Sequence, residues 1–123
     1  MSDRPAVPGH PADQRAAPRR NVIVPVTVVA ADGRRLVGRT LDVSAVGLGL
    51  TLPENVHLGS VVAAALDLPT QKFGVLAVRA SGRVAYSALQ PKTGAYRIGL
   101  QWLTISEGTL RGLRAYSIGG PGY

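Results

Sequence analysis

The chain has 123 residues, with 14 Lys and Arg against 7 Asp and Glu, and so carries a formal net charge of +7. This length suits a single domain with its own core, and a hydrophobic content of 46% excludes a chain that is disordered throughout. The absence of cysteine excludes disulfide scaffolds and thiolate metal sites, and the wide separation of His10 and His57 argues against a histidine-based metal centre.

The first 20 residues differ in composition from the rest of the chain. They contain four prolines, four arginines and almost no bulky apolar side chain. Such a segment cannot bury enough surface to offset its ordering entropy. We therefore predict that this segment is a flexible arm, and the Gly-rich residues 118–123 indicate a frayed C-terminus.

After the arm, short runs rich in β-branched residues alternate with turn signals. The predicted strands cover residues 22–30, 36–43, 46–52, 61–68, 73–86 and 96–102. Pro25 indicates an edge position or a bulge in the first strand. The Asp32-Gly33 pair is typical of a tight hairpin turn, and Ser81-Gly82 suggests a bulge. Turn signals about 8 to 12 residues apart favour an antiparallel barrel or sandwich over βαβ units.

The end of the domain predicts a short helix. The sequence T-I-S-E at residues 104–107 fits a capping box, in which the first and fourth side chains satisfy backbone amides at a helix start. Leu110, Leu113 and Ser117 would then share one face of the helix.

Two features bear on cellular location. The longest apolar run, residues 61–66, is too short to span a bilayer, and the polar N-terminus lacks the apolar region of a signal peptide. We expect a cytoplasmic protein without membrane insertion. Because the chain begins with Met1, we expect it to be free-standing, with an excised module of a larger protein as the alternative.

The positive charge favours an anionic partner. Of the 14 cationic side chains, 12 are arginines, and the planar guanidinium suits bidentate contacts to phosphate and to the edge of guanine. Composition alone does not identify which anion the protein binds.

Two short motifs flank the predicted first hairpin. R-x-x-x-R, with one more arginine adjacent, precedes the first strand, and D-x-S-x-x-G leaves the second; their residues are Arg15, Arg19 and Arg20, and Asp42, Ser44 and Gly47. In this order and context the motifs resemble the PilZ domain family, which binds the bacterial second messenger cyclic di-GMP. The resemblance covers about residues 13–117, and so implies a domain over these residues with a flexible arm over residues 1–12 before it. It implies a six-stranded antiparallel β-barrel with a short C-terminal helix and a flexible N-terminal arm.

The resemblance also implies a ligand site for cyclic di-GMP, made by Arg15, Arg19, Arg20, Asp42, Ser44 and Gly47. Arginine can fork onto O6 and N7 of guanine or stack on the purine. Asp42 can accept from guanine N1–H and its amino group, and Ser44 offers a hydroxyl. Gly47 would allow a positive φ or a close approach to the ligand.

The position of the arginine pair outside the barrel suggests a mechanism. We hypothesise that the ligand clamps residues 13–20 against the barrel mouth, which creates a surface for an unidentified downstream protein. Gln14, where a further arginine would add charge, favours one bound ligand over a stacked pair.

Each motif residue also has an ordinary structural interpretation. Arg15 and Arg19 suit a solvated tail, Asp42 and Ser44 are common turn formers, and Gly47 could mark a bulge.

Other notable residues have simple structural interpretations. Core packing is expected for Trp102 and Tyr96, and a surface loop for His57. Four arginines could either line a solvated face or extend the positive potential towards the ligand: Arg34, Arg35, Arg39 and Arg97.

The resemblance implies a non-catalytic receptor or adaptor that needs no cofactor and relays cyclic di-GMP to the control of motility or exopolysaccharide production. We expect it to be a monomer or a weak dimer. No nucleophile–base pair, carboxylate dyad or metal cluster indicates an enzyme. One alternative is a small basic barrel that binds single-stranded nucleic acid, which the aromatic content of 5% disfavours. The other is a PilZ-like protein-interaction domain that has lost ligand binding.

Overall fold

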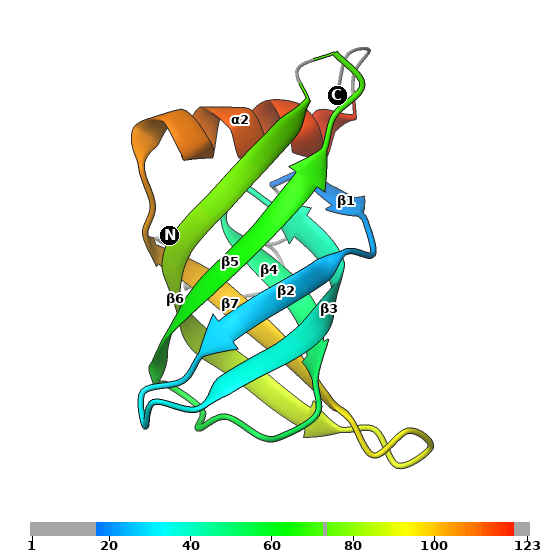
Figure 1. The fold of residues 1–123 in the computed structure, drawn as a ribbon, viewed down its shortest axis with the longest axis vertical. Helices are drawn as coiled ribbons and strands as arrows, with labels where there is room; N and C mark the ends of the chain where they lie inside the picture. The colour runs from blue at the N-terminus through cyan, green and yellow to red at the C-terminus, as the bar shows by residue number, and fades with distance from the viewer. Residues whose placement is uncertain (1–16, 73, 120–123) are drawn as a thin grey trace, which may run out of the picture.

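The computed structural model describes residues 17–72 and 74–119, which form a barrel of strands with one helix across an end (Figure 1). The strands are β1 (Arg19–Asn21), β2 (Pro25–Val29), β3 (Arg35–Ser44), β4 (Gly47–Leu52), β5 (Val61–Pro69), β6 (Val75–Leu89) and β7 (Tyr96–Thr104), and the helix is α2 (Glu107–Ile118). All ladders between these strands are antiparallel.

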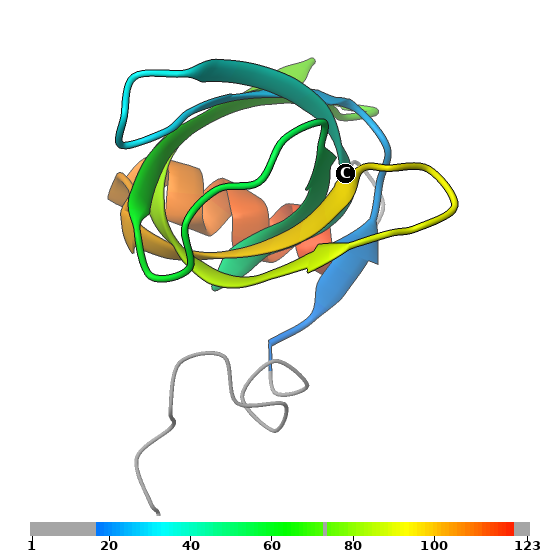
Figure 2. The ribbon, with the colours of Figure 1, turned by 90° about the horizontal axis from the view of Figure 1, so that it is seen from below.

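Six of the strands close into a ring. Their hydrogen-bonded order is β3-β2-β5-β6-β7-β4, and β4 pairs back onto β3. Closure satisfies the backbone groups that an open sheet would expose at its edges. Figure 2 shows this ring from below, with the helix crossing its far end. The predicted fold class, a six-stranded antiparallel β-barrel with a C-terminal helix, is confirmed, and β1 is an additional strand on β3.

Of the predicted first strand, residues 22–30, only Pro25–Val29 forms a strand, β2, and β1 precedes it on the same edge of β3. From Asn21 to Pro25 the chain advances four residues, while β3 advances three from Asp42 to Arg39, so one extra residue is inserted as in a β-bulge. The bulge predicted at Pro25 agrees with this register. The alternative of an edge strand is wrong, because β2 pairs with β3 on one side and with β5 on the other.

Thr40 of β3 fixes the irregular stretch from the inside. Its buried hydroxyl accepts a hydrogen bond from the amide of Val24 at 2.9 Å and donates one to the carbonyl of Val22. These are backbone groups that the bulge removes from the regular ladder, and a buried group left without a partner would be costly. The break between β1 and β2 therefore depends on a side chain 16 residues away from Val24.

The inward faces of the strands make one apolar core. Burial of a Val or Leu side chain contributes about 1.5–3 kcal/mol relative to exposure. The buried hydrophobic residues of the strands are Val26, Val28, Leu36, Val43, Leu48, Leu50, Leu52, Val62, Ala64, Leu66, Leu68, Val78, Val84, Ile98 and Leu100.

Helix α2 covers one end of the barrel. Leu113, Tyr116 and Ser117 are its buried residues, and the Ser117 hydroxyl donates to the carbonyl of Leu113 at 2.6 Å. None of the described helical residues forms a segment long and apolar enough to cross a membrane.

The start of the helix differs from the prediction. Ser106 is the N-cap, and its side chain accepts from the amide of Thr109 at 3.2 Å. The capping box predicted from Thr104 is wrong, because Thr104 is still the last residue of β7. At the other end, α2 includes Ile118 and is capped by Gly119 with a φ of 71°, so these two residues of the predicted C-terminal segment belong to the helix and its cap.

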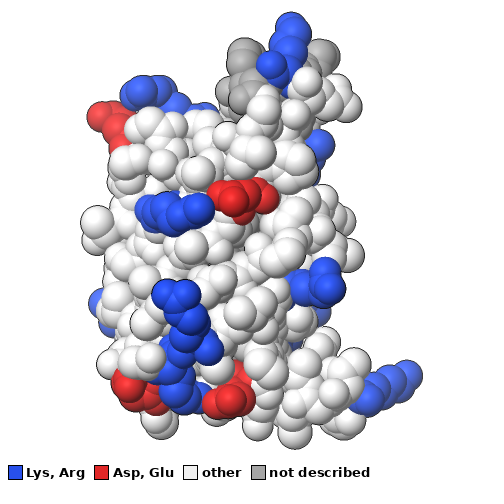
Figure 3. All heavy atoms as spheres, viewed as in Figure 1, with Lys and Arg blue, Asp and Glu red and all other residues white. Residues whose placement is uncertain are grey.

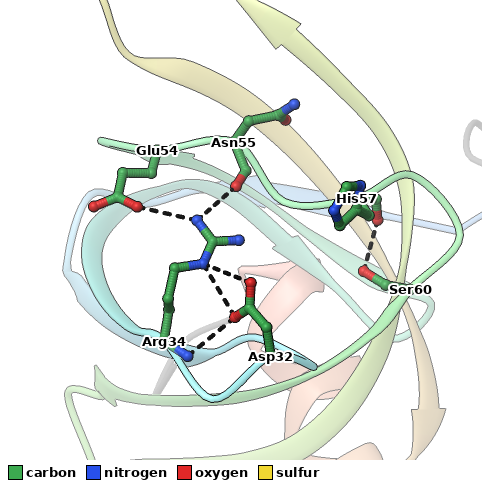
Figure 4. A network of polar contacts seen from close by, with 6 residues as sticks. All are labelled: Asp32, Arg34, Glu54, Asn55, His57 and Ser60. Atoms are coloured by element: carbon green, nitrogen blue, oxygen red, sulfur yellow. Dashed lines mark hydrogen bonds and ion pairs between the residues drawn. The ribbon is translucent and has the colours of Figure 1, made fainter.

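Arg34 joins two loops at the opposite end of the barrel (Figure 4). Its Nε lies 2.8 Å from Oδ2 of Asp32, and its terminal nitrogen lies 3.0 Å from Oε1 of Glu54 and 3.1 Å from the carbonyl of Asn55. The Arg34 backbone amide, followed by its guanidinium, holds the pKa of the Asp32 carboxyl below its usual value. Arg34 therefore ties the β2–β3 turn to the β4–β5 connection.

Candidate functional site

A cavity of about 470 Å³ lies on the side of the barrel near the start of α2. Residues of both sequence motifs line it, namely Arg19, Asp42, Ser44 and Gly47. The wall also includes residues that the sequence analysis did not assign to a site, among them Tyr86, Gln101, Trp102, Leu103, Ile105 and Leu110. The structure therefore gathers β1, β3, β4, β6 and β7 around one hollow.

The pairing of β1 with β3 brings the two motifs together. Arg19 lies opposite Ser44, and Asn21 lies opposite Asp42, so these side chains share one face of the two strands. Among the described residues, neither the Arg19 guanidinium nor the Asp42 carboxylate makes a side-chain hydrogen bond or ion pair. A cation and a carboxylate thus line the cavity without a mutual contact that would neutralise them.

A bulge turns Asp42 towards the cavity. Thr40 and Asp42 would face the same way in a regular strand, yet Thr40 is fully buried and Asp42 lines the cavity. The β3–β4 ladder shifts between these two residues, which reverses the alternation. Val43 then faces the core, where it is 1% exposed. A simple alternating pattern cannot predict this reversal.

A second bulge acts in the same way on Tyr86 of β6. Val84 is buried in the core, and the β6–β7 ladder shifts between Val84 and Tyr86. Tyr86 therefore faces outward, with 39% of its surface exposed. Its ring covers Gly99, where an added Cβ would overlap the ring atoms.

Two glycines form the floor between Asp42 and Tyr86. Gly49 of β4 lies opposite Asp42 on one side and opposite Gly99 of β7 on the other. A Cβ at Gly49 would lie 2.8 Å from Oδ1 of Asp42. Because both glycines lack side chains, the carboxylate and the ring can lie close to the backbone at the two ends of this row. The sequence signal that could have indicated this floor is the presence of glycine at outward-facing positions of two strands.

Ser44 organises the turn that leaves β3. Its hydroxyl oxygen accepts hydrogen bonds from the amides of Val46 at 3.1 Å and Gly47 at 3.2 Å. Its carbonyl accepts from the indole Nε1 of Trp102 at 3.0 Å. Ser44 is only 2% exposed, so its polar atoms depend on these partners. The turn-forming interpretation of Ser44 is therefore correct, and the residue lines the cavity as well.

Two roles were expected for Gly47, a positive φ or a close approach to the ligand. Its φ is not positive, so the first is wrong, and the second stays a prediction. An added Cβ would overlap the carbonyl oxygen of Leu100. Glycine at this position allows β4 to approach β7 closely at the edge of the cavity.

Arg20 lies on the other side of β1, away from the cavity. It pairs with Val43, whose side chain points into the core, whereas Arg19 pairs with Ser44. The Arg20 guanidinium carbon lies 4.2 Å from the centre of the Tyr116 ring, and a terminal nitrogen donates to the Tyr116 carbonyl at 3.2 Å. Arg20 thus contacts α2, and Arg15 lies outside the described residues.

Trp102 was expected in the core, and it both packs against the core and lines the cavity. Tyr96, on the same strand, packs against the core. Within residues 17–72 and 74–119, no three His, Asp or Glu side chains form a group that could hold a metal ion. On the face seen in Figure 3, Lys and Arg lie in separate groups among larger uncharged areas.

Comparison with protein-family models gives a match to the PilZ domain over residues 13–119. Comparison with curated protein sequences gives no significant match.

Three solved structures share the fold. The inhibitor of motility MotI/DgrA of Bacillus subtilis superposes with a TM-score of 0.70 at 18% identity, over 83% of this chain and 48% of that one. The PilZ domain of YcgR from Escherichia coli with c-di-GMP gives 0.56 at 19% identity, over 86% and 90%. A crystal structure of YcgR in complex with c-di-GMP gives 0.62 at 18% identity, over 86% and 45%.

The present chain thus spans about half the length of MotI and of the longer YcgR chain. The family match covers both motifs, the whole barrel and α2. The chain belongs to the PilZ domain family.

Proposed function

We propose that this protein is a non-catalytic cytoplasmic receptor that binds cyclic di-GMP in the 470 Å³ cavity and relays the signal to a downstream protein. The observation that carries the proposal is the convergence of two separate motifs on one cavity. Arg19 comes from the first motif, and Asp42, Ser44 and Gly47 come from the second. The YcgR structures that share this fold contain c-di-GMP.

The cavity offers the chemistry that a cyclic dinucleotide needs. The Arg19 guanidinium can contact phosphate or the O6 and N7 edge of guanine. Asp42 can accept from guanine N1–H and the amino group, which no arginine can do. The Ser44 oxygen already accepts two amide hydrogen bonds, and its hydroxyl hydrogen remains available to a ligand oxygen.

The cavity also offers apolar surface for the faces of the bases. Tyr86 presents a partly exposed ring at the end of the glycine floor, and Leu103 and Ile105 extend the wall towards α2. Stacking on such surfaces is sequence-tolerant for purines, so the polar contacts of Arg19 and Asp42 would supply the discrimination.

We further propose that residues 13–20 contribute the second arginine, Arg15, and clamp the ligand against the barrel. The end of this segment, Arg19 and Arg20, belongs to β1 and pairs with β3, and Arg19 lines the cavity. We also propose that each domain binds one ligand and that the protein is a monomer or a weak dimer. MotI, which shares the fold, is an inhibitor of motility, and this supports a relay through a protein partner.

The proposal is tested by calorimetric titration of the purified chain with cyclic di-GMP, with GTP and a single-stranded oligonucleotide as controls. The double variant Arg15→Ala/Arg19→Ala should lose the binding heat while its melting temperature stays unchanged. Arg97→Ala is the matched control, because Arg97 is an exposed arginine on β7 that does not line the cavity.

We expect saturable binding heat with cyclic di-GMP and none with GTP or the oligonucleotide. The double variant should lose this heat, and Arg97→Ala should keep it. No heat from a folded wild-type chain would contradict the proposal. Oligonucleotide binding whose salt dependence weakens in the double variant would instead support a nucleic-acid-binding barrel.

A further inference from the structure

Trp102 contacts the turn between β3 and β4 through two separate hydrogen bonds. Its indole Nε1 donates to the carbonyl of Ser44 at 3.0 Å, and its backbone amide donates to the carbonyl of Val46 at 3.0 Å. The two acceptors lie on either side of the β3–β4 turn. One residue of β7 therefore holds both sides of the turn that carries the second motif.

The indole bond is the only one of these contacts that depends on the identity of the side chain. The Val46 carbonyl would be satisfied by the backbone of any residue except proline at position 102. The Ser44 carbonyl, in a residue that is 2% exposed, accepts from the indole N–H, which only the side chain at position 102 supplies. Phenylalanine could fill much of the same space, but it has no donor.

The position of Ser44 in turn sets the positions of its neighbours in the cavity. Ser44 pairs with Arg19 across the β1–β3 ladder, and Asp42 lies two residues before it on β3. The Ser44 hydroxyl is fixed by the amides of Val46 and Gly47 within the turn. A shift of the Ser44 backbone would therefore displace a hydroxyl, a guanidinium and a carboxylate together.

We propose that Trp102 is a positioning residue for ligand binding, and that its indole N–H fixes the Asp42–Gly47 turn in the geometry that the ligand requires. This inference rests on the proposed binding of cyclic di-GMP in the cavity. The side chain also packs against the core, so it joins the barrel interior to the cavity wall. Its role differs from that of Arg19 and Asp42, because it acts on the ligand through the Ser44 backbone.

The sequence permits a test that removes one hydrogen-bond donor and changes the shape of the side chain very little. Trp102 is the only tryptophan in the chain, so biosynthetic replacement of tryptophan changes this position alone. Benzothienylalanine has nearly the shape of tryptophan, with sulfur in place of the indole N–H, whereas fluorotryptophan keeps the donor. Trp102→Phe is a genetically encoded variant without the donor, and Tyr96→Phe is its control, since Tyr96 packs on the core from the same strand but does not line the cavity.

We expect the benzothienyl protein and Trp102→Phe to fold and to bind cyclic di-GMP about three- to tenfold more weakly than the wild type, which is the effect of one net hydrogen bond. The fluorotryptophan protein and Tyr96→Phe should bind like the wild type. In the proton–nitrogen NMR spectrum of the wild type, the single indole signal should shift when cyclic di-GMP is added. A merely structural role would lower the melting temperature and leave the affinity of the folded protein unchanged.

Equal affinities of the wild-type and benzothienyl proteins would overturn this inference while leaving the proposed function intact. The same loss in Tyr96→Phe as in Trp102→Phe would also overturn it, because the effect would then not be specific to the turn. Absence of binding by the folded wild-type chain would overturn the proposed function, and this inference with it.

Discussion

Adjacent arginines at the start of the domain have different environments because β1 is a strand. Arg19 lies on the face that carries Ser44 and lines the cavity, whereas Arg20 contacts Tyr116 of α2. The sequence could identify both as cations near the motif. It could not assign them to opposite faces, because that assignment needs the register of β1 on β3, and nothing in a Pro- and Arg-rich segment sets this register.

The close packing at Gly47 should matter for stability. Gly47→Ala should lower the free energy of unfolding by about 1–3 kcal/mol, since the new Cβ would overlap the carbonyl oxygen of Leu100 and separate β4 from β7. Urea unfolding measures the change.

The matched control is Gly108→Ala in the first turn of α2, where the nearest atom to an added Cβ is 4.0 Å away. That variant should be neutral or slightly more stable, because alanine favours a helix over glycine. Equal stabilities of the two variants would show that the close approach of β4 to β7 is not what requires Gly47.

At the scale of the elements, local patterns predicted the strands better than their irregularities. The alternation in residues 96–102 correctly predicted the inward faces of β7. The bulges that turn Asp42 and Tyr86 outward arise from pairing with β4 and β7, and a single strand's sequence does not show where its partner gains or loses a residue. Tyr86 was therefore missed as a cavity residue, and Asp42 was found only through the family motif.

The Asp32–Arg34 contact should make the stability of the fold depend on pH. The pKa of Asp32 is lowered in the folded protein from its usual value of 3.8, chiefly by the backbone amide of Arg34. The contact therefore stabilises the fold above about pH 4, and this contribution is lost as the pH falls through the lowered pKa.

Asp32→Asn keeps the acceptor for the Arg34 amide and removes the charge. We expect it to reduce the loss of stability between pH 5 and pH 2, measured by urea unfolding across that range, relative to the wild type. If the two proteins lost stability in parallel, the charge of Asp32 would not contribute to holding the β2–β3 turn against the β4–β5 connection.

On the scale of the whole molecule, closure of the barrel assembles the cavity. Because β4 pairs with both β3 and β7, the turn of the second motif lies between β1 on one side and Trp102 on the other. The helix, whose Leu110 also lines the cavity, borders the same region. Motifs with recognisable spacing identified the two ends of this site, but the apolar wall is contributed by residues far along the chain whose sequence context indicated core packing.

Binding of cyclic di-GMP in this cavity can be measured by an NMR titration of the isotope-labelled chain with cyclic di-GMP. We expect saturable shifts that are largest in residues 19–21, 42–49 and 99–102, and small on the outward faces of β2 and β5, which lie outside the cavity. Shifts centred on β2 and β5, or no saturable shift in the folded chain, would contradict the proposed binding.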